Sequence, residues 1–354
     1  MVVGRRWGMW LEPCEGSQLP DEEFGDIVNR PIDYDTVIVH LIPEYYARWS
    51  ERERGKTLIG NTVWELEKLP QSWPDALNQM DSLIVPCRWN RETFRAAGVT
   101  RPIAVVPHVG SPSLVAKRPF SVEGIEPDDF VFYTIAAWRE RNAPYLALQS
   151  YLSAFTEADK TVFVIKTSRV NERLRHRRFW WHYVTRHIYA PLAEIKRIRK
   201  LSGSSARVVA TADSMPDSEI QALHERGDCY VSLTHSEGWG LGAYDAAFAG
   251  NPVIITGYGG QLDYLPASLA YHVDYRMVPS RSAHPTWAGN GTSAPAWAEP
   301  DLAMGARLMR EVFSHPEQAR KRGARLQQFV REHFDADKII ESMLTFVRSR
   351  ARDS

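Results

Sequence analysis

The sequence is poor in cysteine, and it has no excess charge of either sign. Its three cysteines, Cys14, Cys87 and Cys229, are far apart and form no Cys-x-x-Cys pair, which argues against a disulfide framework and against a zinc site. The 43 lysines and arginines equal the 43 aspartates and glutamates, so no global field attracts nucleic acid. We therefore expect a cytoplasmic protein without a nucleic-acid partner.

Long apolar runs and several ligand-binding signatures are also missing. The apolar stretches, such as residues 130–138, are of strand length, well below the ~20 residues that cross a bilayer. The basic pair near the amino terminus has no apolar core after it, so we expect no signal peptide. No P-loop pattern occurs, which argues against a kinase or an ATPase. No Asp-x-Asp pair lies near the motifs below, and we expect no bound metal and no other cofactor.

The length and the alternation of patterns predict two α/β domains. A chain of 354 residues is longer than the ~250–300 residues over which one core grows. Strand-like runs alternate with helical ones, which is typical of parallel, doubly wound sheets. We expect a Rossmann-like domain at 1–110, a linker at 111–128, a second Rossmann-like domain at 129–334, and a helix at 335–354 that crosses back to the first domain. Ligands of such sheets bind at the carboxyl ends of the strands, here in a cleft between the domains.

The individual elements follow from β-branched runs, helical periodicity and breaker residues. In the first half we predict a helix at 90–97 and strands at 35–40, 57–63, 82–86 and 103–107. In the second half we predict strands at 130–137, 161–166, 207–210, 229–233 and 253–255. The predicted helices there are 143–155, 217–226, 241–249, 301–313, 316–334 and 337–348.

The most informative segment, residues 232–260, reads SLTHSEGWGLGAYDAAFAGNPVIITGYGG. A strand leads through a polar, glycine-rich loop into a helix, whose first N–H groups favour an anion such as a phosphate or diphosphate. Glu237 precedes the helix and Asp245 lies inside it, so both carboxylates can reach the same ligand site at the start of the helix. An acid beside a phosphate is favourable where it binds hydroxyls, as of a sugar or ribose. The alternative is a Glu237 that only caps the helix and a solvated Asp245.

This segment resembles a known family. Glu-Gly-x-Gly-Leu, an acid eight positions after the glutamate, and Ala-x-Ala-Gly-x-Pro-Val-Ile are similar to the Glu-x7-Glu motif of retaining nucleotide-sugar glycosyltransferases. These form the family-four-like group with the two-Rossmann-domain GT-B fold. The resemblance extends more weakly through residues 130–166, 297–301 and 86–110, and it hardly touches the first 80 residues.

The resemblance implies roles for the loop and the helix. Glu237 would contact the hydroxyls of the donor sugar. The family binds ribose with a second glutamate, and Asp245 stands there with a side chain one methylene shorter. The N–H groups near sugar and phosphate would be those of Gly238, Trp239, Gly240 and Leu241.

The same family places an arginine and a lysine on the donor diphosphate, where cations neutralise the leaving group and take the role of a metal. Lys166, at a strand end, matches the lysine. Arg141, which precedes an asparagine, is the first choice for the arginine, and Arg139 is the second. Thr211 begins the loop where the family lodges its nucleobase. The alternative is that Lys166, Arg141 and Arg139 are solvated side chains at strand ends.

In the first domain, His40 ends an apolar strand. The resemblance implies a histidine near the donor sugar, whereas a strand-end histidine is otherwise a satisfied structural residue. Trp64 and Glu65 could line an acceptor site, or form an ordinary amphipathic turn.

Residues 166–200 carry eleven lysines and arginines against two acids, interleaved with aromatics. This composition suits peripheral contact with an anionic membrane, a lipid-phosphate acceptor or nucleic acid. The alternative is a solvated helical excursion whose aromatics pack onto the domain or a second subunit.

The resemblance implies a metal-independent retaining glycosyltransferase that moves a hexose from a nucleoside-diphosphate sugar to an acceptor hydroxyl in glycan, polysaccharide or glycolipid assembly. Neither the nucleotide nor the acceptor follows from the sequence. Two other classes stay open: a sugar-nucleotide epimerase or phosphorylase of the same fold, and a non-catalytic nucleotide-sugar binding protein.

Overall fold

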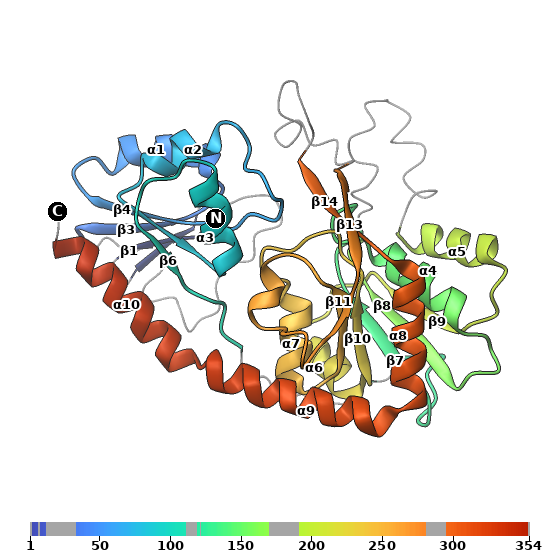
Figure 1. The fold of residues 1–354 in the computed structure, drawn as a ribbon. Helices are drawn as coiled ribbons and strands as arrows, with labels where there is room; N and C mark the ends of the chain where they lie inside the picture. Colours follow the sequence, from blue (N-terminus) through green and yellow to red (C-terminus); the bar gives the residue numbers. More distant parts are fainter. Residues whose placement is uncertain are drawn as a thin grey trace. The chain divides into compact units, whose positions relative to one another are not determined.

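The computed structural model of the chain describes residues 2–5, 8–11, 33–110, 119–120, 122–169, 191–280 and 295–352. The chain divides into two compact units (Figure 1). Unit 1 comprises Met1–Val109 with Asp335–Ser354, and unit 2 comprises Gly110–Phe334. Each unit contains a largely or wholly parallel sheet with helices, so the predicted α/β class is confirmed.

The sheet of unit 1 has the strand order β2-β1-β3-β4-β5-β6. Strands β3 to β6 are parallel, and β1 pairs antiparallel with both β2 and β3. The strands are β1 (Val2–Arg5), β2 (Gly8–Leu11), β3 (Thr36–His40), β4 (Thr57–Asn61), β5 (Ser82–Val85) and β6 (Ile103–Val105). Strands β1 and β2 were not predicted, because glycine and arginine interrupt their short apolar runs.

Helices cover both faces of this sheet. They are α1 (Tyr46–Arg52), α2 (Trp73–Asn78), α3 (Arg88–Ala96) and α10 (Ala336–Arg352). Figure 1 shows α1 and α2 on one face and α10, drawn in red, on the other. Helix α3 begins where the backbone N–H of Asn90 donates to the Cys87 sulfur, 3.4 Å away. Cys87 is therefore a buried cap residue with a free thiol.

The sheet of unit 2 has the order β12-β11-β10-β7-β8-β9, and all its neighbours are parallel. The strands are β7 (Phe130–Ile135), β8 (Thr161–Lys166), β9 (Val208–Thr211), β10 (Cys229–Ser232), β11 (Val253–Thr256) and β12 (Tyr271–Val273). Counted from β7, the order is 6-5-4-1-2-3, the doubly wound arrangement of dinucleotide-binding sheets. Its topological switch point lies between β7 and β10, where such sheets bind their ligands.

Because this sheet is covered on both faces, its strands are continuous apolar runs. Strand β8, for example, is buried from Thr161 to Ile165. The helices are α4 (Pro144–Ala154), α5 (Pro191–Ser202), α6 (Asp217–Arg226), α7 (Leu241–Ala249), α8 (Leu302–Ser314) and α9 (Pro316–His333). Figure 1 shows α6 and α7 on one face and α4 and α8 on the other. Among the described helices, none has the length and apolar character to cross a membrane.

Most elements of unit 2 lie where the sequence predicts them. The strand 161–166 and the helices 217–226 and 241–249 coincide with β8, α6 and α7. Helix α5 and the antiparallel pair β13 (Tyr275–Pro279) and β14 (Ala296–Pro300) were not predicted. Strand β13 is mostly exposed, so it lacks the alternation that marks a half-buried strand.

Part of the predicted linker is bound to unit 2. Arg207 Nη2 donates to the carbonyl of Gly124 at 2.8 Å, and Arg226 Nη2 donates to that of Glu126 at 2.9 Å. Residues 122–128 therefore pack with the sheet domain. Cys14 and residues 170–190 of the basic segment lie outside the described residues.

Candidate functional site

The candidate site lies at the switch point of unit 2, where the ends of β7 and β10 meet. The segment after β7 carries Arg141 and Asn142. The segment after β10, residues 234–240, is called the donor loop below. Because β7 and β10 are hydrogen-bonded neighbours, residues more than ninety positions apart come together there.

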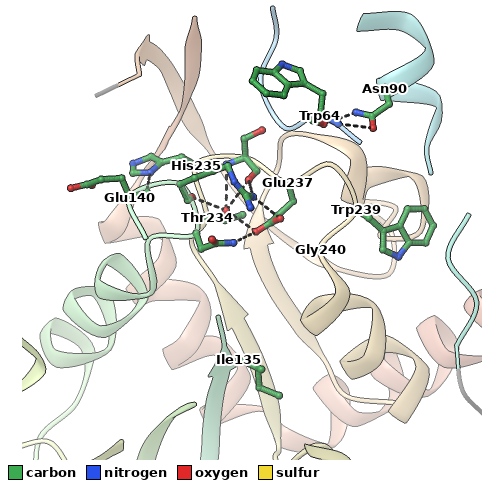
Figure 2. A network of polar contacts seen from close by, with 12 residues as sticks. Trp64, Asn90, Ile135, Glu140, Thr234, His235, Glu237, Trp239 and Gly240 are labelled. Carbon is green, nitrogen blue, oxygen red and sulfur yellow. Dashed lines mark hydrogen bonds and ion pairs between the residues drawn. The ribbon is translucent and has the colours of Figure 1, made fainter. Parts of the chain in front are cut away.

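The side chain of Glu237 joins the donor loop to the segment after β7 by hydrogen bonds (Figure 2). Its Oε2 accepts a hydrogen bond from Arg141 Nη1 at 2.7 Å, and its Oε1 accepts one from Asn142 Nδ2 at 2.6 Å. The side chains of Glu237 and Arg141 are only 16% and 11% exposed. A partly buried ion pair with this geometry fixes the carboxylate and offsets its charge.

Backbone atoms tie the donor loop to the segment after β7. Arg141 Nη1 also donates to the Ser236 carbonyl at 2.7 Å. The hydroxyl of Thr234 lies 3.0 Å from the Arg141 carbonyl oxygen and donates to it. Asn142 and Thr234 were not identified from the sequence, because nothing local marks them as partners of Glu237.

Two glycines let the chain approach Glu237 and the sheet closely. Gly259 has a φ of 99°, and a Cβ on it would lie 2.7 Å from the Glu237 carbonyl oxygen. The next residue, Gly260, donates its N–H to that oxygen at 2.8 Å. A Cβ on Gly242 would lie 2.6 Å from the hydroxyl of Tyr230, so only glycine lets the first turn of α7 sit this close to the strand ends.

Helix α7 begins directly after the donor loop. Its N-cap Gly240 is left-handed, with a φ of 85°, and no side chain caps the helix. The first-turn N–H groups and the helix dipole give this end a preference for an anion. The geometry thus agrees with the sequence-based expectation for residues 238–241, whose contact with sugar or phosphate stays a prediction.

Trp239 itself belongs to the core. It is 3% exposed, its ring packs against Tyr244, Tyr264 and Phe334, and it points away from the Glu237 network in Figure 2. The Tyr264 hydroxyl lies 2.8 Å from the carbonyl oxygens of both Trp239 and Gly240. Only the backbone of Trp239 is therefore available to a ligand, whereas Leu241 is 56% exposed.

Asp245, the second predicted acid, lies on α7 and is partly buried. Burial raises the pKa of its carboxyl group to about 6, and the nearby negative charge of Asp217 adds to the increase. A carboxyl group in this state is protonated in part near neutral pH, when it can donate as well as accept a hydrogen bond.

Lys166 and Thr211 end the neighbouring strands β8 and β9 and are register partners. Lys166 is half-buried, and its Nζ donates to the Thr167 carbonyl at 3.0 Å. Burial lowers the pKa of its ammonium group, an effect that the charge of Asp213 partly offsets. Lys166 and Thr211 thus lie at the carboxyl ends of two adjacent strands, and Thr211 is the last residue of β9 rather than the first residue of the following loop. The roles of both residues stay predictions.

Arg139, the second-choice arginine, is exposed on the loop after β7. Its carbonyl accepts from the N–H of Ala143, which has a left-handed φ of 44° at the start of α4. The loop therefore turns sharply and directs Arg141, rather than Arg139, to the Glu237 carboxylate. The diphosphate role of either arginine stays a prediction.

His40 lies in unit 1, at the end of β3. Desolvation lowers its pKa, and desolvation together with the charge of His40 lowers the pKa of His108. Trp64, in contrast, is 2% exposed and bonds to Asn90 through both its backbone N–H and carbonyl. The hypothesis that Trp64 lines an acceptor site is therefore wrong for its ring, because the ring is part of the core. The role of His40 stays a prediction.

Among the described residues, no three histidine, cysteine, aspartate or glutamate side chains gather into a metal site. The charged groups at the carboxyl ends of the strands include the Glu237–Arg141 pair and Lys166, which ends β8. Such a set can bind hydroxyls and a phosphate side by side.

A family model matches part of the sequence. Residues 189–343 match the model described as Family 4 Glycosyltransferase in conflict systems. The matched stretch includes the donor loop, α7 and β14. The resemblance to family-four-like glycosyltransferases is therefore confirmed. Among curated proteins, no sequence matches the chain.

Solved structures share the fold. A sucrose-phosphate synthase from Thermosynechococcus elongatus aligns with a TM-score of 0.66 and 14% identity, over 91% of this chain and 75% of its own. HepE of Anabaena, in complex with UDP and glucose, aligns with a TM-score of 0.63 and 12% identity, over 89% and 78%. TarM of S. aureus, in a complex that includes UDP, aligns with a TM-score of 0.60 and 12% identity, over 86% of this chain but only 54% of its own. The chain has the GT-B fold, as predicted.

Proposed function

We propose that the protein is a retaining glycosyltransferase that transfers a hexose from a nucleoside-diphosphate sugar to an acceptor hydroxyl, in glycan, polysaccharide or glycolipid assembly. The observation that carries the proposal is the fixed carboxylate of Glu237, held by Arg141 and Asn142 at the switch point of the sheet. The family match supports the reaction class.

The Glu237 carboxylate suits the hydroxyls of a donor sugar. The carboxylate accepts hydrogen bonds from Arg141 and Asn142 and a longer one, of 3.4 Å, from the Thr234 hydroxyl, and a further lone pair on Oε2 can accept from a hydroxyl group of the ligand. The ion pair with Arg141 offsets the repulsion that an unpaired acid would exert on a neighbouring diphosphate. Glu237 therefore binds the sugar without expelling the phosphates.

We assign the diphosphate to two features of unit 2, the amino-terminal end of α7 and the side chain of Lys166. The amino-terminal end of α7 offers N–H groups, and Lys166 offers an ammonium group. These groups stabilise the charge that develops on the departing nucleotide, a role that is independent of a metal. Asp245 and Thr211 bind the nucleoside, with Asp245 on the ribose hydroxyls.

The first donor to test is UDP-glucose, because HepE was solved with UDP and glucose. We propose same-face substitution, in which the leaving phosphate helps to deprotonate the acceptor, because the resemblance to retaining glycosyltransferases implies this mechanism.

The decisive experiment titrates UDP, GDP and ADP, and then their glucose conjugates, into wild type, Glu237→Gln and the exposed control Glu157→Gln. We expect one diphosphate to bind, and the added affinity of its sugar to fall at least about tenfold in Glu237→Gln only. Binding of no nucleotide would overturn the proposal.

Product analysis separates the other classes. A transferase attaches the labelled hexose to an added acceptor, an epimerase or phosphorylase returns a different sugar nucleotide or a sugar phosphate, and a binding protein shows affinity without turnover. A product with inverted configuration would contradict the retaining mechanism.

We further propose that the protein binds peripherally to the cytoplasmic face of a membrane. Helix α5 exposes Leu192 and Leu201 together with Lys196, Arg197 and Lys200. We expect anionic liposomes to retain the wild type and to release a variant in which these three cations are replaced by glutamine. Equal retention of both would contradict this contact.

A further inference from the structure

A buried histidine two positions before Glu237 joins three segments of unit 2. His235 is 3% exposed, and hydrogen bonds reach it on four sides. Its backbone N–H donates to the Arg141 carbonyl at 2.9 Å, and its carbonyl accepts from the N–H of Ala298 at 3.0 Å. Its ring Nδ1 lies 2.7 Å from the Glu140 carbonyl oxygen, and its Nε2 lies 3.0 Å from Glu299 Oε2.

These partners determine which ring nitrogens carry hydrogen. A carbonyl oxygen has no hydrogen to donate, so Nδ1 of His235 is the donor to Glu140. In the neutral tautomer with hydrogen on Nε2, the lone pair of Nδ1 would face a lone pair of the Glu140 carbonyl oxygen, with 2.7 Å between the two atoms. Between Nε2 and the Glu299 carboxylate one further proton is needed to form the second bond. With that proton, both ring nitrogens of His235 donate, each to an oxygen that can only accept.

The surroundings of the ring also favour a positive charge. The Trp297 indole lies parallel to the His235 ring, with 4.2 Å between the centroids and 5° between the planes. A cation on the face of an indole is stabilised by its π-electrons. The segments bonded to His235 carry the charged side chains of Glu299, which is 32% exposed, of Glu140, whose carboxylate accepts from the Tyr145 hydroxyl, and of the Glu237–Arg141 pair.

From this geometry we infer that His235 is a buried imidazolium that positions the donor loop by bonding it to both β14 and the segment after β7. The inference rests on the proposed function, because it concerns the site that holds the donor sugar. His235 touches no ligand itself, since both ring nitrogens are occupied. It acts on Arg141 and Asn142, which follow Glu140 directly and hold the Glu237 carboxylate.

Loss of the ring charge therefore has a specific consequence. A neutral ring with its hydrogen on Nδ1 keeps the bond to Glu140 and loses the attraction to the Glu299 carboxylate. Of the two hydrogen bonds between His235 and β14, only the one from the Ala298 N–H to the His235 carbonyl then remains. We expect Glu237 to lose its fixed orientation, so that the sugar of the donor binds more weakly while the nucleotide binds as before.

The first test is heteronuclear NMR of the ring nitrogens in the full-length chain with labelled histidine. We expect the imidazolium signature for His235 at neutral pH in the wild type. In Glu299→Gln we expect a neutral ring with hydrogen on Nδ1, because the amide can donate to Nε2 and keeps the shape of the side chain. His235→Phe identifies the resonance and keeps the stacking on Trp297. A neutral ring in the wild type would overturn the inference.

The second test compares UDP with UDP-glucose in the wild type, Glu299→Gln and the control Glu157→Gln. We expect the affinity for UDP to change less than about twofold, and the extra affinity from glucose to fall about tenfold in Glu299→Gln only. An equal loss for both ligands would show a merely structural role and overturn the positioning role. If the wild type binds neither ligand, the proposed function fails and the positioning role with it, whereas the charge of His235 is still decided by NMR.

Discussion

Arg141 Nη1 lies 2.7 Å from both Glu237 Oε2 and the carbonyl oxygen of Ser236. One guanidinium nitrogen thus holds the side chain of the candidate sugar-binding acid and the backbone just before it. The acid and the cation form a unit, and we expect their substitutions to be non-additive.

A double-mutant cycle measures this coupling. We expect Glu237→Gln and Arg141→Met to show a coupling free energy of about 1–3 kcal/mol in urea unfolding, because each single change leaves a largely buried charge without its partner. The exposed pair Lys160–Asp128 is the control and should show no measurable coupling. Additive effects at Glu237 and Arg141 would contradict the prediction.

Lys166 should matter for turnover. We expect Lys166→Met to lower kcat about a hundredfold, since it removes a cation from the departing diphosphate. Affinity for the diphosphate should fall more than affinity for uridine. The control is Lys160→Met, at the other end of the same strand. Steady-state kinetics with the donor that the titration identifies measure kcat for both variants. An unchanged kcat in Lys166→Met would show that Lys166 is only a strand-end residue.

Asp245 should make stability depend on pH. Because burial raises its pKa from 3.8 to about 6, the folded state binds a proton more tightly than the unfolded state does. Its contribution to stability is therefore fully present below about pH 4 and is lost as the pH rises through 6. We expect Asp245→Asn to be more stable than the wild type at pH 7, by about 1–3 kcal/mol, with the difference shrinking at pH 4. Thermal melts across this range measure it, and a constant difference would contradict it.

Gly323 on α9 should tolerate no side chain. A Cβ there would lie 2.4 Å from the carbonyl oxygen of Gly250 and 2.8 Å from the nitrogen of Pro252. Helix propensity alone predicts that Gly323→Ala stabilises the chain by about 1 kcal/mol. The close packing predicts a loss of about 1–3 kcal/mol instead. The sign of the change in urea unfolding decides between the two.

The sequence was sufficient for features that depend on near neighbours. Apolar runs and breaker residues predicted β8, α6 and α7 at their observed bounds. Lys166 could be placed at the end of its strand because the β-branched run ends there. The exposed strand β13 was missed because it shows no burial period, and β1 and β2 were missed as well.

Contacts between distant segments could not be predicted in the same way. The bonds of Glu237 to Asn142, and of His235 to Glu299, join segments that are 95 and 64 residues apart in the chain. The burial of Trp239 was likewise not visible, since an aromatic residue in a glycine-rich loop suits a ligand site as well as a core.

The sequence by itself determined the α/β alternation, the glycine-rich entry into α7 and the presence of an acid beside it, because these depend on backbone geometry within a few residues. The tertiary structure decided which cation pairs with that acid, that Trp239 supplies only backbone, and that His235 is bonded at both ring nitrogens. The reason is the strand order, in which β7 lies between β10 on one side and β8 on the other. That order brings Arg141 rather than Lys166 to Glu237, and it is a property of the whole sheet.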